Sequence, residues 1–120
     1  MKEDYMFFRD ELTSGFMRLL ETNPFSERIK KLWEMGEYSD SNCYGTAFYV
    51  TNMSDVLRFV WPEEFLDKIR KMRNGKTKGS IVVVRINGKH KHAGIYMGRV
   101  GRYEMMFDQR GIGDKFAPQL

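Results

Sequence analysis

The first part of the chain carries apolar residues at helical spacing. Between residues 4 and 20 they recur at steps of three and four, which predicts an amphipathic helix. The same spacing returns over residues 24–36, where Pro24 suits a first helical turn and Gly36 an end, so a second helix is expected there. The apolar positions of the two helices are Tyr5, Phe8, Leu12, Phe16, Leu19, Phe25, Ile29, Leu32 and Trp33.

Two more helices are predicted in the middle of the chain. Residues 43–50 are almost entirely apolar, which indicates a mostly buried helix. The segment Trp61-Pro62-Glu63-Glu64 has the proline and acidic residues typical of a helix start, and Asn74-Gly75 is a stop signal. The buried face of this fourth helix is expected to consist of Phe65, Ile69 and Met72.

From Gly79 the pattern changes to that of strands. Ile81 to Val84 is a β-branched run suited to a buried strand, and Asn87-Gly88 is a two-residue hairpin turn. Residues 92–97 and 103–107 are predicted as two further strands. Helices followed by antiparallel strands indicate an α+β domain.

The chain length suits one domain. The 120 residues contain no repeat and no low-complexity linker, so residues 1–120 are expected to form a single unit. Residues 1–36 would be its helical N-terminal part and residues 37–120 its core. The sequence ends soon after the third predicted strand, so a sheet edge is expected to remain open and could pair in a homodimer.

Composition excludes several classes of protein. A hydrophobic fraction of 42% with 14% aromatic residues argues against long disorder. No apolar run approaches the roughly 20 residues of a membrane span, and the charged start lacks the pattern of a signal peptide. We therefore expect a cytoplasmic protein without membrane contact, with non-classical export or delivery by a phage left open. The single cysteine excludes an internal disulfide, and no metal-ligand spacing is present.

Charge is divided unevenly along the chain. Residues 1–67 hold 7 Lys or Arg against 13 Asp or Glu, a net charge of −6, whereas residues 68–120 hold 13 against 3, a net charge of +10. Between Lys68 and Lys91 there are nine basic residues and no acidic one. This run is either a solvated face or a surface for an anionic partner such as nucleic acid. No aromatic residue interrupts it to stack on bases.

One cysteine and one histidine could carry chemistry. Cys43 stands at the expected start of a helix, where the dipole and free N–H groups favour a thiolate and an oxyanion. His90 and His92 alternate along one strand and are expected to face opposite sides, so that only one of them can point into a site. The alternative is that Cys43 is merely a small buried apolar residue.

Three segments, in order, resemble the NlpC-type family of papain-like cysteine peptidases. Asn42-Cys43-Tyr44-Gly45 and the residues up to Val50 resemble its nucleophile helix, which opens with an Asp-Cys-Ser-Gly-type motif. Gly79 to Val84 is similar to its Gly-Asp-hydrophobic strand, and His92 to Gly98, His-Ala-Gly-Ile-Tyr-Met-Gly, matches its His-x-Gly-Ile-Tyr-x-Gly strand. The resemblance spans roughly residues 36–113 and implies a papain-like fold, with helices packed on a small antiparallel sheet.

The resemblance also implies roles for residues. Cys43 would be the nucleophile and His92 the general base, and no cofactor is implied. The third polar residue of the family lies on the strand after the histidine, which makes Asp108 our choice and Gln109 the reserve. Tyr44 and Tyr38 would contact substrate, with Trp33 a further candidate for the upstream groove.

The resemblance favours a hydrolase that cleaves an amide bond in a peptide or a peptidoglycan stem. Three positions depart from the family pattern: Asn42 replaces Asp, Tyr44 replaces Ser and Ser80 replaces the Asp of the middle strand. The alternative function is a non-catalytic binding module of the same fold that uses its basic C-terminal half to bind an anionic partner.

Overall fold

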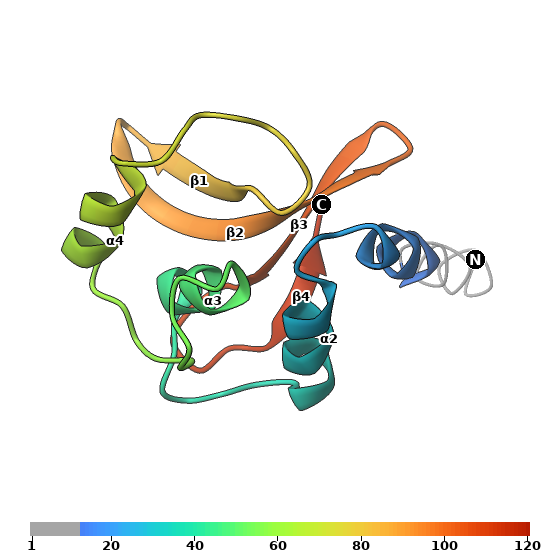
Figure 1. Ribbon diagram of the computed structural model, residues 1–120, viewed down its shortest axis with the longest axis horizontal. Coiled ribbons are helices and arrows are strands. Elements are labelled where there is room, and N and C mark those ends of the chain that lie inside the picture. Colours follow the sequence, from blue (N-terminus) through green and yellow to red (C-terminus); the bar gives the residue numbers. More distant parts are fainter. Residues whose placement is uncertain (1–12) are drawn as a thin grey trace.

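Helices precede a four-stranded sheet in the computed structural model, which describes residues 13–120 (Figure 1). Residues 13–21 are helical, and the part of the first predicted helix before residue 13 lies outside the described residues. The strands pair antiparallel in the order β1-β2-β3-β4, which confirms the predicted α+β class. The elements that follow the first helix are α2 (Ser26–Met35), α3 (Cys43–Val50), α4 (Pro62–Ile69), β1 (Ile81–Ile86), β2 (Lys89–Val100), β3 (Tyr103–Gln109) and β4 (Phe116–Gln119).

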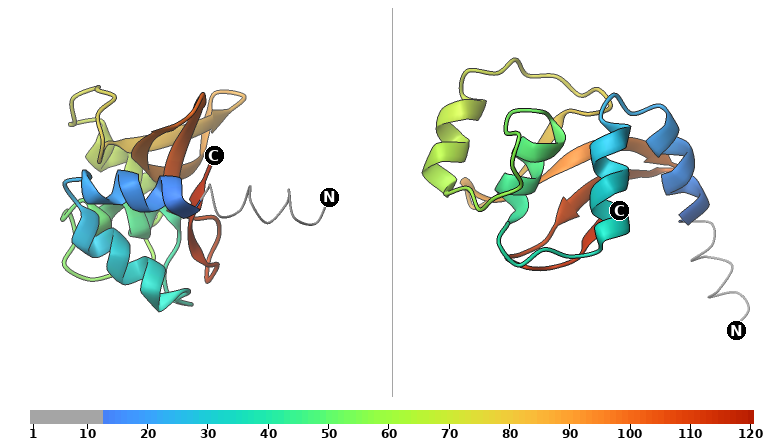
Figure 2. Two further views of the ribbon diagram at one scale, coloured as in Figure 1. Left: turned by 90° about the vertical axis from the view of Figure 1, so that its right-hand side faces the viewer. Right: turned by 60° about the horizontal axis from the view of Figure 1, so that its bottom comes forward.

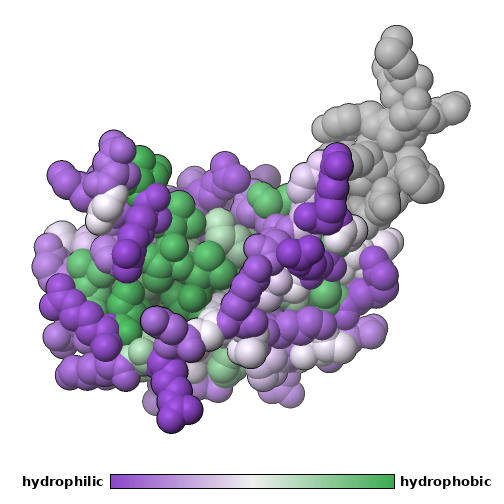
Figure 3. Space-filling model, turned by 90° about the horizontal axis from the view of Figure 1, so that it is seen from above, coloured by the Kyte–Doolittle hydropathy of each residue, from purple (hydrophilic) through white to green (hydrophobic). Residues whose placement is uncertain are grey.

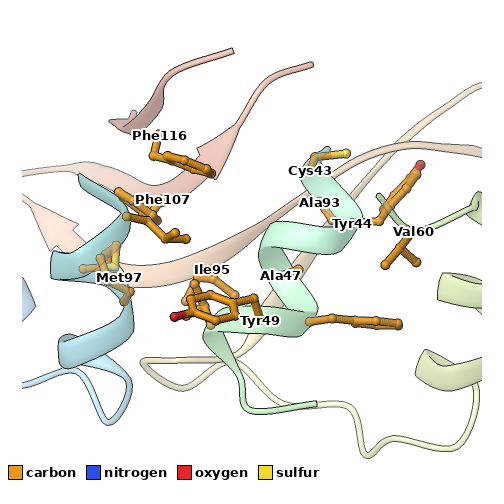
Figure 4. Packing of buried hydrophobic residues seen from close by; sticks show 14 of the residues in the cluster. Cys43, Tyr44, Ala47, Tyr49, Val60, Ala93, Ile95, Met97, Phe107 and Phe116 are labelled. Carbon is orange, nitrogen blue, oxygen red and sulfur yellow. The ribbon is translucent and has the colours of Figure 1, made fainter. Parts of the chain in front are cut away.

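Helix α3 lies at the centre of the core. All eight of its residues are buried, and it packs on β2 and β3. Figure 4 shows Ala47 and Tyr49 of this helix close to Ile95 of β2, with Phe107 and Phe116 from β3 and β4 beside them. A helix that is apolar all round is a buried one, as the sequence pattern predicted. Helices α2 and α3 lie on the same side of the sheet (Figure 2).

The N-terminal helix is anchored to the sheet by aromatic contacts. Phe16 is fully buried and stacks on Phe107 of β3, with ring centroids 5.9 Å apart. Its ring also meets the edge of Trp33 at 4.9 Å. Trp33 is partly buried and packs against the core. No helix within residues 13–120 is long and apolar enough to cross a membrane.

Several elements differ from the sequence-based expectations. Helix α4 ends at Ile69, well before Asn74, and Met72 is 44% exposed instead of buried. Strand β2 runs from Lys89 to Val100 and is twice as long as expected. Strand β4 was not predicted; it pairs with β3 and covers the edge that was expected to stay open after the third strand. As an edge strand, β4 tolerates Pro118, which has no N–H to donate.

A β-bulge separates the two histidines. Val84 pairs with His92 but Arg85 pairs with His90, so β2 carries one extra residue, Lys91, at this point. Val84 and Arg85 are neighbours in a strand and point to opposite faces, and their partners do the same. In a regular strand His90 and His92 would share a face. The bulge thus leaves only one of them free to join a given site.

Candidate active site

Cys43 is the first residue of α3, as expected from the sequence. Asn42 caps the helix, because its side-chain oxygen accepts a hydrogen bond from the Gly45 N–H at 3.0 Å. The N–H groups of Cys43 and Tyr44 belong to the first turn, and within residues 13–120 neither has a hydrogen-bond partner. Two free donors and the positive end of the helix dipole therefore lie beside the thiol.

Asn42 also ties this helix start to the segment that leads into α4. Its side-chain oxygen accepts from the Val60 N–H at 3.1 Å, and its side-chain nitrogen donates to the Val60 carbonyl at 2.9 Å. The buried side chain thus donates and accepts at once, which an ionised aspartate cannot do. This gives a physical reason for an amide where the resemblance would place an acid.

Gly45 allows the same segment to pass close to the helix. A Cβ atom at this position would lie 1.7 Å from the Arg58 carbonyl oxygen, well inside any contact distance. The glycine two residues after Cys43 is therefore required by packing. It brings the 58–60 backbone within reach of Asn42 and so helps fix where the thiol stands.

His92 is held by a buried carboxylate on the neighbouring strand. Its Nε2 lies 2.6 Å from Asp108 Oδ2, and the Asp108 side chain is fully buried while that of His92 is 18% exposed. Gly94 leaves room for this contact: a Cβ there would lie 3.3 Å from the Asp108 Cβ and 2.9 Å from the Met106 sulfur. The glycine of the His-Ala-Gly segment therefore clears the path between the two strands.

His92 also lies beside Cys43. Its hydrogen bond to Asp108 and then its contact with the Cys43 thiol raise the pKa of His92 from 6.5 to about 9, against an opposing effect of burial. Since Nε2 is turned to Asp108, Nδ1 is the ring nitrogen left for the thiol. Cys43 retains 8% of its surface, so it is mostly covered. The fold thus brings together Cys43, His92 and Asp108 from three separate elements.

Gln109, the reserve candidate, makes its side-chain hydrogen bonds to groups other than His92. It is fully buried, and its side-chain oxygen accepts from Ser41 at 2.7 Å and from Thr46 at 3.1 Å. Its nitrogen donates to the Tyr38 and Asp114 carbonyls at 3.0 and 2.9 Å. Gln109 therefore ties α3 to the loops before it and after β3, and Asp108 is the residue that reaches the imidazole.

The two tyrosines named as substrate contacts occupy different environments. Tyr44 is only 6% exposed, and its ring lies 4.5 Å from that of Phe65 of α4. Burial and then the charge of Cys43 raise its pKa. Tyr38 is 37% exposed, and its carbonyl accepts the bond from Gln109. Tyr44 thus borders the thiol, whereas the hydrogen bonds of Tyr38 are to Ser41 and Gln109.

Some residues that shape the site did not stand out in the sequence. The contacts of Asn42 with Val60 and the clearance at Gly94 involve partners 18 and 14 residues away, which no local pattern indicates. Only the N-cap role of Asn42 has a local signal, a polar residue directly before a buried helix. Within the part of the chain that the structure describes, no group of three His, Cys, Asp or Glu side chains could hold a metal ion.

No protein-family model, no curated protein and no solved structure matches this chain.

Proposed function

We propose that this protein is a papain-like thiol hydrolase of the NlpC type that cleaves an amide bond in a peptide or peptidoglycan stem. The observation that supports this most directly is the position of His92 between the Cys43 thiol and the buried Asp108 carboxylate. A structural cysteine needs no imidazole beside it, and a structural histidine needs no thiol at a helix N-terminus with free N–H groups.

The chemistry would begin with a proton already on the histidine. Because the pKa of His92 is raised to about 9, the imidazole carries a proton at neutral pH, and it stabilises a neighbouring thiolate. The Cys43 sulfur attacks the carbonyl carbon, and the resulting oxyanion accepts hydrogen bonds from the N–H groups of Cys43 and Tyr44. His92 then protonates the leaving amine as the carbon–nitrogen bond breaks.

Water completes the cycle. With the amine gone, His92 is neutral and takes a proton from the attacking water, which opens the thioester and releases the acid. Asp108 keeps the ring oriented and stabilises the imidazolium in both half-reactions. Asp108 acts through His92 and touches no reacting atom, so it is a positioning residue.

Alkylation of Cys43 by iodoacetamide tests the proposal without a known substrate. Cys43 is the only cysteine, so the modified fraction measured by mass spectrometry reports one site. At pH 6 an ordinary thiol is almost wholly protonated. We expect wild-type protein to react at least about tenfold faster there than His92→Gln, because the imidazolium maintains the thiolate. Glutamine still donates to Asp108, so the buried carboxylate keeps a partner.

His90→Gln is the matched control. It changes the other histidine of the same strand, on the opposite face, and should react like the wild type. Equal rates for wild type and His92→Gln at every pH would reject the thiolate–imidazolium pair. A Cys43 that stays unmodified in the folded wild type would reject it as well.

A non-catalytic binding module is the second candidate function. It is favoured by Arg70, Arg73 and Arg85, which form no ion pair within residues 13–120. If an anionic partner such as nucleic acid binds this basic half, the affinity should fall steeply with salt and should be unaffected by Cys43→Ala. An affinity that is absent at moderate salt would argue against nucleic acid.

A further inference from the structure

A groove lies between α4 and β1. Its volume is about 840 Å³, within the range of sites that bind small molecules or peptide segments. Leu66 and Ile69 of α4 face Ile81 and Val83 of β1 across it, and all four are only partly buried. Seen from above, a broad apolar surface on the side of the molecule away from the N-terminus is ringed by hydrophilic side chains (Figure 3). We refer to this feature as the α4–β1 groove.

The rim of the α4–β1 groove is basic. Arg70, Arg73 and Arg85 line it together with His90, and no acidic side chain does. All three arginines are exposed, and within residues 13–120 none of them forms a hydrogen bond or an ion pair through its side chain. The groove therefore offers aliphatic surface and unneutralised positive charge to the same ligand.

The groove also borders an unpaired strand edge. β1 is the first strand in the sheet order and pairs only with β2 among the described elements. In an antiparallel ladder alternate residues bond the partner strand. The Tyr96 N–H donates to the Ser80 carbonyl at 2.8 Å, which fixes which residues of β1 bond to β2. The backbone groups of Ile81, Val83 and Arg85 therefore point away from β2, and the same three residues line the groove.

We propose that the α4–β1 groove binds an extended peptide segment with alternating aliphatic and acidic residues, which adds to the sheet beside β1. The free N–H and C=O groups of β1 would supply a ladder of main-chain hydrogen bonds. The aliphatic side chains of the peptide would contact the apolar floor of the groove, and its acidic side chains, which alternate with them, would contact the arginines. No Phe, Tyr or Trp side chain lines the groove, so the rings on which the bases of single-stranded nucleic acid stack are missing.

This docking site is separate from the candidate active site. His90 lines the groove, whereas His92 and its contacts to Asp108 and Cys43 lie on the other side of the bulge. Peptide binding therefore does not depend on the proposed hydrolase activity. Cys43→Ala should bind the peptide as the wild type does, so a failure of one proposal is distinguishable from a failure of the other.

The direct test is fluorescence anisotropy with the fluorescein-labelled, acetylated peptide Glu-Val-Glu-Val-Glu-Val. Its length matches the six residues of β1. We expect saturable binding that weakens with salt, and no binding of the corresponding Lys-Val peptide. Arg70→Glu/Arg85→Glu should weaken binding by about tenfold or more, since two attractive contacts become repulsive. Arg18→Glu, on the exposed face of the N-terminal helix, is the matched control and should leave the affinity unchanged.

Backbone pairing is tested by methylating the peptide nitrogens. In a strand added beside β1, alternate peptide N–H groups face the protein. Methylation of the three alternate nitrogens that face the protein should abolish binding, and methylation of the three that face away should not. Val83→Pro removes an outward N–H of β1 and leaves the ladder to β2 intact, so it should also abolish binding. The methylated peptides give the answer even if this variant does not fold.

Four results would overturn the proposal. The first is no binding of the Glu-Val peptide at millimolar protein, and the second is equal binding of both methylated forms. The third is tighter binding of anionic phospholipid vesicles than of the peptide, which would identify a lipid site. The fourth is a concentration-dependent dimer, seen by light scattering, that Arg70→Glu/Arg85→Glu dissociates. That result would make a second copy of this chain the occupant of the groove.

Discussion

The ion pair between His92 and Asp108 predicts a specific dependence of stability on pH. Asp108 is fully buried, one of its oxygens accepts from His92 at 2.6 Å, and the other has no partner within the described residues. Asp108→Asn keeps the shape of the side chain and removes its charge. Since the bond to Asp108 is the largest cause of the raised pKa, the pKa of His92 should fall toward 6.5 in this variant.

The size of the effect follows from linkage. The pKa of His92 is 6.5 when unfolded and about 9 when folded, and each unit is worth roughly 1.4 kcal/mol. This gives at most about 3.5 kcal/mol, and about 2 kcal/mol after an allowance for the 18% exposure of the His92 side chain. Because the folded pKa is the higher one, this stabilisation is complete below pH 6.5. It is lost as the pH rises through about 9.

The assay is urea unfolding of wild type and Asp108→Asn at a series of pH values from 5.5 to 10. The contributions of the other titrating groups cancel in the difference between the two free energies of unfolding. We expect wild type to be more stable by about 2 kcal/mol at pH 6, and the difference to approach zero near pH 10. The chain has two histidines, so NMR titration of the ring protons, with His90→Gln for assignment, measures the pKa of His92 directly.

Two outcomes would refute this reasoning. In the first, the stability difference between wild type and Asp108→Asn is the same at every pH, so that Asp108 contributes packing alone. In the second, His92 titrates near 6.5 in the wild type, which would mean that the ion pair does not form in solution. Either result would also remove the electrostatic basis for a thiolate at Cys43.

Two further substitutions test the packing around the site. Gly45→Ala should destabilise the protein by about 3 kcal/mol or more and lower Cys43 alkylation, because the new methyl group would overlap the Arg58 carbonyl; a melting temperature within a degree or two of wild type would contradict this. Gln109→Leu should cost about 3 kcal/mol, measured by urea unfolding, because it leaves four hydrogen bonds of a buried side chain unmade; Gln109→Glu keeps the acceptor and should lose only the two donated bonds. A neutral Gln109→Leu would show that water satisfies these groups.

The helix that carries the candidate nucleophile was fully predictable from the sequence. The buried run at residues 43–50 and the polar cap before it gave both boundaries of α3 correctly. The choice between Asp108 and Gln109 was not predictable, because consecutive strand residues point to opposite faces and the choice depends on the register of β3 against β2. A bulge between Tyr96 and Gly98 shifts that register by one residue, and nothing in the local pattern indicates it.

The bulge at Lys91 has the larger functional consequence. With Lys91 as an extra residue, the imidazole of His92 turns to Asp108 while that of His90 turns to the α4–β1 groove. Without it, both rings would lie on one face, and a single-residue slip reverses every side chain of a strand segment. The candidate active site and the groove can therefore use the two faces of one strand because β2 contains this residue. The alternation of side chains predicts their faces only in a regular strand. It therefore cannot show whether His90 and His92 lie together in one site or apart in two.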